Sequence, residues 1–181
     1  TATGGTVYST PVSISGTAVL RATAFRTDWQ SPAIGTHTYI FRDDVILSSE
    51  MDTAITEDPT YGPQLRDALA DLPTVSLVHV GDVDREEEQT SIELINFGAN
   101  PSLQVGAGIE RYGSYSTNFA KRSFRLAFRS KWGASKLNFP LFEGHSRDLA
   151  AADQFDALEL RSGSHDMNQR GFYLSNRFCD D

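Results

Sequence analysis

The sequence lacks the features that are typical of disulfide-stabilised proteins and of membrane-spanning proteins. Its 181 residues include a single cysteine, Cys179, so no internal disulfide can form. No apolar run reaches about eighteen residues, and none is therefore expected to span a membrane. The first residues lack the basic and apolar regions of a signal peptide, and residue 1 is not methionine. The chain is expected to begin inside a longer protein and to bury one core of ordinary size, or one core plus a small partner module.

Positive charge is also scarce. The chain has 16 Lys and Arg against 24 Asp and Glu, and its formal net charge of −8 argues against general nucleic-acid binding. Thirteen acidic residues lie between Asp43 and Glu88. Seven of the sixteen basic residues lie between Arg111 and Lys136, where no acidic residue occurs. This basic segment is where a phosphate or another anion is expected to bind.

The first forty residues carry the alternation of short antiparallel strands. The segments predicted as strands are TVYS (6–9), VSIS (12–15), AVLRATAFR (18–26) and GTHTYIF (35–41). Because an independent sandwich usually needs about seven strands, these are expected to be the end of one.

This pattern, TPVSISGTAVLRATAFRTDWQSPAIGTHTYIF, resembles the C-terminal repeat of the chitobiase/β-hexosaminidase family. The resemblance implies a small immunoglobulin-like module of secreted glycan-active and surface proteins, which serves chiefly as a spacer. For Tyr8, Trp29 and Tyr39 we favour packing on a core or strand face over a sugar-binding platform.

The acidic segment 43–72 is predicted to be an irregular linker that ends in one short helix. Pro63 suits the first helical turn, and Leu65, Ala68, Leu69 and Leu72 follow helical spacing. Residues 73–80 and 90–97 are predicted strands, and 83–89 a solvated turn. The three carboxylates of Glu86–Glu88 suggest a metal site, but neighbouring carboxylates point in different directions, which favours a solvated loop.

The second half contains two strands with clean alternation. In SFRLAFRS (123–130), Phe124, Leu126 and Phe128 are expected to face the core, and Arg125 and Arg129 the opposite, basic side. FDALELRSG (155–163) repeats the arrangement. The glycines of VGAGIERYG (105–113) lack the spacing of a dinucleotide-binding loop, so close strand packing explains them better.

From Leu72 onward the chain resembles the amino-terminal half of the spore-coat protein H (CotH) kinase family. The resemblance rests on an ordered set of segments: LPTVSLV, IELINF, LQVGAGIERYGSYSTNFAKRSFRLAFRSKWGASKLNFPLF and FDALELRSGSHDMNQ. It implies a secreted or spore-surface, distantly kinase-like enzyme that transfers the γ-phosphate of ATP to Ser-rich proteins with the help of Mg²⁺. The metal-binding and catalytic aspartates of the family are expected beyond Asp181, so the catalytic residues are unknown and this piece alone is expected to be inactive.

The resemblance also implies candidate phosphate-binding residues, namely Lys121, Arg125, Arg161 and Ser114. For the cations, the competing interpretation is a solvated basic face or ion pairs with Glu110 and Glu159. For Ser114, the alternative is an ordinary hairpin turn. The four histidines do not complete a ligand spacing, and no metal site is predicted from them.

The predicted fold class is α+β, mainly β. Residues 1–42 are assigned to the end of an immunoglobulin-like module, 43–72 to an acidic linker with a short helix, and 73–181 to a CotH-like region truncated within a helix. The expected setting is extracellular or at the cell surface, with a Ser-rich protein substrate and neighbouring domains of the same chain as partners. A structural or adhesive surface protein is the alternative, and sugar binding through Tyr8, Trp29 and Trp132 is the weakest hypothesis.

Overall fold

The structure is a computed structural model, and it is mainly β. Strands make up 33% of the described residues and helices 14%, in agreement with the coarse fold class predicted from the sequence. The described residues are 5–28, 33–113, 122–143 and 151–162. The predicted helix after Asp166, like Trp29, Ser114 and Lys121, lies outside them.

The chain divides into two compact units. Unit 1 comprises Thr1–Val78 and Ile92–Gln104, and unit 2 comprises His79–Ser91 and Val105–Asp181. One five-stranded sheet has the order β3 (Thr74–Val78), β4 (Glu88–Ile95), β5 (Leu103–Tyr112), β6 (Ser123–Ala127) and β9 (Ala157–Leu160). The strands predicted over 73–80 and 90–97 are confirmed as β3 and β4.

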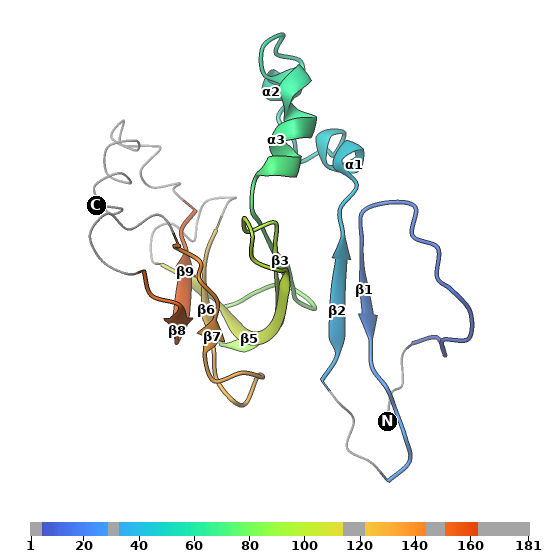
Figure 1. The fold of residues 1–181 in the computed structure, drawn as a ribbon, viewed down its shortest axis with the longest axis vertical. Coiled ribbons are helices and arrows are strands. Elements are labelled where there is room, and N and C mark those ends of the chain that lie inside the picture. Colours follow the sequence, from blue (N-terminus) through green and yellow to red (C-terminus); the bar gives the residue numbers. More distant parts are fainter. Residues whose placement is uncertain (1–4, 29–32, 114–121, 144–150, 163–181) are drawn as a thin grey trace. The chain divides into compact units, whose positions relative to one another are not determined.

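Unit 1 begins with a two-stranded antiparallel ribbon. Strand β1 (Ala18–Ala22) pairs with β2 (Gly35–Tyr39), and the two lie side by side in Figure 1. The predicted strands at 6–9 and 12–15 are wrong, because these residues are not in strand conformation. Val7 is 88% exposed and Tyr8 74% exposed, so this segment buries little apolar surface that would stabilise further strands.

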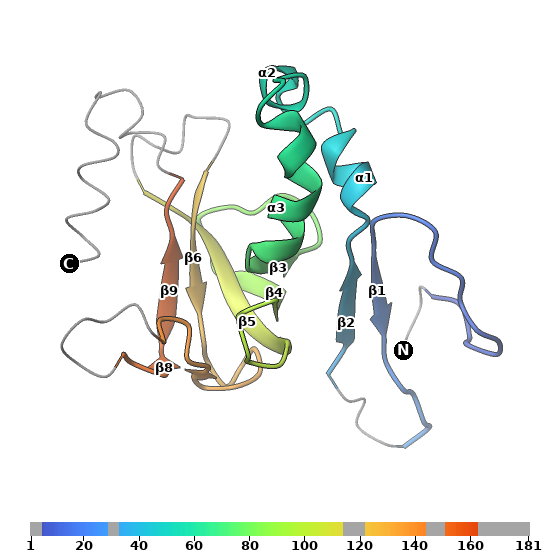
Figure 2. The same ribbon diagram turned by 45° about the horizontal axis from the view of Figure 1, so that its top comes forward.

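Short helices follow the ribbon in unit 1. The predicted helix is confirmed as α3 (Leu65–Asp71), which is preceded by a 3₁₀ turn, η1 (Gly62–Gln64), with proline in its first turn. Two further helices, α1 (Arg42–Ile46) and α2 (Thr53–Thr56), lie where an irregular linker was expected. Helix α1 lies beside α3 (Figure 2), and Arg42 donates a hydrogen bond of 3.1 Å to the Arg66 carbonyl. Such contacts between segments stabilise helices too short to form alone.

Unit 2 is built on the antiparallel strands β5, β6 and β9. Their register places Ile109 opposite Leu126 and Leu126 opposite Leu158. The predicted strand 155–163 is divided at Asp156 into β9 and the short β8 (Gln154–Phe155), which pairs with β7 (Leu137–Asn138). The buried apolar residues of this unit are Ala107, Ile109, Leu126, Ala127, Phe128, Leu137 and Phe139.

Candidate functional site

A cavity of about 550 Å³ opens in unit 2 at one end of β6 and β9. Two of its apolar lining residues, Phe124 and Leu160, are direct neighbours across the two strands, and we call this pair the floor of the cavity. Its described lining residues are Gly81, Asp82, Val83, Arg122, Phe124, Leu160, Arg161 and Ser162. The volume is within the range of small-molecule sites.

The end of the cavity is held together by two serines. The Ser162 backbone N–H donates to the Ser123 hydroxyl at 3.0 Å, and the Ser123 hydroxyl donates to the Ser162 hydroxyl at 3.3 Å. Both residues are buried. These bonds join the chain after β9 to the start of β6, and they thereby position the neighbouring Arg161 and Arg122.

The polar lining of the cavity is predominantly cationic. The described lining residues include two arginines, Arg122 and Arg161, and one aspartate, Asp82. Guanidinium groups present several N–H donors in a plane, which suits bidentate binding of carboxylate or phosphate. A lining that combines the apolar floor residues with two arginines therefore suits a ligand that has both a ring and an anionic group.

The candidate Arg161 lies at this cavity, but Arg125 is not among its described lining residues. Arg125 Nη1 lies 3.4 Å from Glu110 Oε1, and in the register Arg125 is opposite both Glu110 and Glu159. This is the ion-pair environment that the sequence left open as the alternative. Lys121 and Ser114 lie outside the described residues.

The second arginine of the cavity, Arg122, was not selected from the sequence. It precedes the first residue of β6, so strand alternation assigns it no face. The loop residues Gly81–Val83 were also missed, because the sequence of a polar turn does not indicate which part of the fold the turn packs against. Arg122 was indicated in the sequence only by its place in the basic segment and in the CotH-like segment that contains it.

The acidic turn contains a well-partnered carboxylate, contrary to the prediction of a solvated loop. Glu87, with a side chain only 15% exposed, accepts a 2.5 Å hydrogen bond from Trp132 Nε1 and lies 3.0 Å from both Arg129 Nε and Lys131 Nζ. Burial by itself raises the pKa of Glu87. The hydrogen bonds from Trp132 and Lys131, with the charge of Arg129, outweigh burial, so this pKa lies below its usual value.

The same cluster explains two glycines of the VGAGIERYG segment. A Cβ at Gly108 would lie 2.6 Å from both Glu87 Cγ and Trp132 Nε1, and one at Gly106 would collide with the Trp132 carbonyl. Close packing, as predicted, rather than phosphate binding, accounts for these glycines.

Of the aromatic residues in the sugar-binding hypothesis, Trp29 lies outside the described residues, and Trp132 has its own partners within unit 2. One face of the Trp132 ring is covered by Lys131 Nζ, 4.4 Å from the ring centroid, and the indole N–H is bound to Glu87. Tyr8 belongs to unit 1, whereas Trp132 belongs to unit 2. The predicted packing of Tyr8 on a core is wrong, since most of its surface is exposed.

The described residues contain no group of three or more His, Cys, Asp or Glu side chains arranged to hold a metal ion. No helix within the described ranges is long and apolar enough to cross a membrane.

Comparison with protein-family models, curated proteins and solved structures finds no significant match to this chain.

Proposed function

We propose that the cavity of unit 2 binds ATP and that the chain is part of a CotH-type phosphotransferase. In this proposal the phosphates lie at Arg122 and Arg161, and the adenine ring packs against Phe124. The single observation that supports it best is that two arginines and the apolar residues Phe124 and Leu160 line the same cavity; one of these arginines, Arg161, was a candidate from the sequence.

The chemistry of phosphoryl transfer favours this assignment. Transfer depends on positioning and on neutralising the charge of the phosphates, so cations are needed where the phosphates lie. Guanidinium groups remain charged at any physiological pH. An apolar floor contributes affinity for the ring by removing its surface from water.

The described residues fit the phosphates but not the metal. Asp82 is the one carboxylate in the described lining of the cavity, and Mg²⁺ sites in kinases use at least two metal-binding side chains. No transfer step is therefore assigned to these residues. Under this proposal, the resemblance to the CotH family implies metal-binding aspartates outside the described residues, and an acceptor Ser or Thr on an extracellular or envelope protein.

Calorimetric titration of the purified chain with ATP, ADP and AMP tests the proposal. Affinity is expected to fall in that order, because each phosphate removed deletes contacts with Arg122 and Arg161. Arg161→Ala and Arg122→Ala are each expected to weaken ATP binding by about tenfold or more, the effect of losing one charge-assisted contact.

Two further variants sharpen this test. Arg66→Ala makes the same change of charge in unit 1 and is expected to leave ATP affinity unchanged. Arg125→Ala distinguishes the cavity from the basic strand face, because it weakens binding only if the phosphates lie on that face. Absence of ATP and ADP binding by the unaltered chain would overturn the proposal and favour the structural or adhesive alternative.

A further inference from the structure

One wall of the cavity is a loop without secondary structure. Gly81, Asp82 and Val83 line the cavity and belong to the connection between β3 and β4. A loop of this kind needs contacts with the sheet if it is to keep a fixed distance from the cavity floor. Gly81 has a φ of +91°, a conformation that glycine adopts readily and that turns the chain at the start of this wall.

The next residue, Asp84, is bound twice by Arg111. The Arg111 backbone N–H donates to the Asp84 carbonyl at 2.6 Å, and Arg111 Nη2 donates to Asp84 Oδ1 at 2.8 Å. Asp84 Oδ1 also accepts from the Arg85 backbone N–H at 2.8 Å. Both the carbonyl and the carboxylate of Asp84 are thus bound to Arg111. Two bonds to one residue restrict the rotation of the loop as well as its distance from β5.

Arg111 belongs to β5, the strand that pairs with β6. In the register Arg111 lies opposite Phe124, and Phe124 lies opposite Leu160. Arg111, Phe124 and Leu160 therefore form one row across β5, β6 and β9, and the last two are the floor. The Arg111 side chain is 22% exposed, so it is held by its surroundings, whereas that of Asp84 is 72% exposed.

We infer that Arg111 is a positioning residue that acts through Asp84 to hold the Gly81–Val83 wall over the Phe124–Leu160 floor. The inference rests on the proposed function in one respect, the identity of the ligand as ATP. The attachment of the loop to β5 does not depend on that proposal. Arg111 does not line the cavity among the described residues, so it acts on the ligand through the wall.

Two variants with opposite changes of charge distinguish an effect of loop position on ATP affinity from an effect of the electrostatic potential. Arg111→Met removes a positive charge and Asp84→Asn removes a negative one, yet both break the same ion pair. If the pair positions the wall, both variants weaken ATP binding, by about fivefold or more. If only the potential near the cavity matters, Arg111→Met weakens binding and Asp84→Asn strengthens it, and the inference is wrong.

Hydrogen exchange of the backbone amides of residues 85 and 111 supplies a readout that needs no ligand. Both amides donate to Asp84, so their exchange is expected to be about tenfold faster in both variants. Arg111→Lys keeps the charge and is expected to retain part of the protection of these amides against exchange. Arg66→Met, in unit 1, is expected to change neither amide exchange nor ATP affinity. If exchange accelerates but the unaltered chain does not bind ATP, the proposed function fails and the attachment stands. Unchanged exchange in both variants overturns the inference.

Discussion

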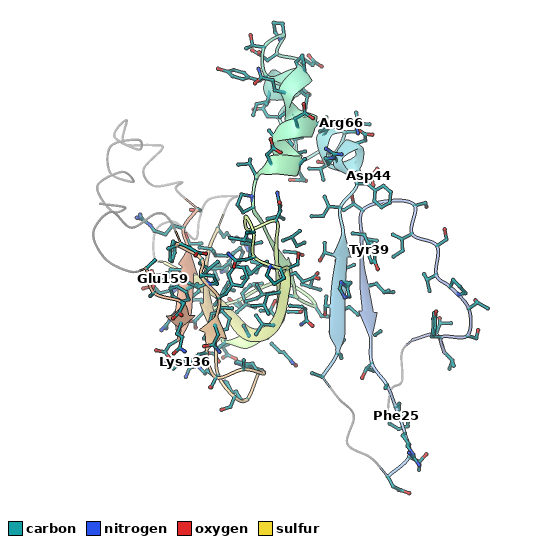
Figure 3. All side chains as sticks on the ribbon, in the orientation of Figure 1. Phe25, Tyr39, Asp44, Arg66, Lys136 and Glu159 are labelled. Atoms are coloured by element: carbon teal, nitrogen blue, oxygen red, sulfur yellow. The ribbon has the colours of Figure 1, made fainter. Side chains whose placement is uncertain are left out.

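The β1–β2 ribbon of unit 1 and the β5, β6 and β9 strands of unit 2 have similar sequence patterns but different environments. All five residues of β1 are exposed, including Val19 and Leu20. In β6, by contrast, Leu126 and Ala127 are buried, and so is Phe128, which follows the strand. Figure 3 shows Phe25 standing apart at the end of the ribbon, whereas the side chains around β6 and β9 are crowded.

The difference between the two regions is the number of partner strands. Strand β6 is paired on both edges, with β5 and β9, whereas β1 has β2 as its one partner among the described strands. Two-stranded ribbons are marginally stable by themselves, because neither face has enough neighbours to exclude water. Alternation therefore predicts a strand, but neighbouring elements decide whether its apolar face is buried.

The largest contrast is expected between two identical substitutions. Phe128→Ala removes a buried ring and is expected to lower the free energy of unfolding by about 3 to 5 kcal/mol. Phe25→Ala removes a ring that is 59% exposed, with an expected loss within about 0.5 kcal/mol. Urea unfolding followed by circular dichroism measures both. Equal losses would show that the ribbon is packed as tightly as unit 2.

A smaller effect, dependent on pH, is expected at Glu87. Its pKa is lowered in the folded chain, so its carboxylate contributes stability above the ordinary carboxyl pKa of about 4.3, and this contribution disappears as the pH falls through the folded value. Glu87→Gln is expected to cost about 1 to 2 kcal/mol at pH 7, since Arg129 and Lys131 are partly exposed.

The corresponding control lies in unit 1. Arg66 pairs with Asp43, and both side chains are more than half exposed, so Asp43→Asn is expected to cost within about 0.5 kcal/mol at any pH. Unfolding measured at pH 7 and at about pH 3 distinguishes the two pairs. A Glu87→Gln deficit that grows on acidification would contradict the lowered pKa.

The smallest contrast concerns two residues that face each other in the ribbon, Val19 and Thr38. Thr38 Oγ1 donates to the buried carboxylate of Glu93 at 2.5 Å, and it lies 2.7 Å from Ser76 Oγ. Thr38→Val is expected to cost about 1 kcal/mol, because Ser76 is near enough to compensate in part. Val19→Thr, of the same shape, is expected to change stability by less than about 0.5 kcal/mol. Thermal unfolding of both variants checks this, and equal changes would mean that the ribbon is not held through Thr38.

The candidate site could be predicted only in part. Arg161 was selected on its resemblance to a family motif, and it lines the cavity. Arg122 and Gly81–Val83 were not selected, since the first precedes a strand and the others belong to a turn. Alternation predicted that Arg125 lies on the basic face of its strand, but it did not predict that Glu110 lies opposite Arg125.

Local sequence was sufficient for much of the secondary structure. The spacing in 65–71 specified α3, alternation specified β2 and β6, and short apolar segments specified β3 and β4, because these patterns act over a few neighbouring residues. Contacts between distant segments decided the rest: the pairing of Arg111 with Asp84, the burial of Glu87 under Trp132, and the cavity itself. Each depends on register and loop placement, which are set by the energy of the whole packed unit rather than by the residues on either side.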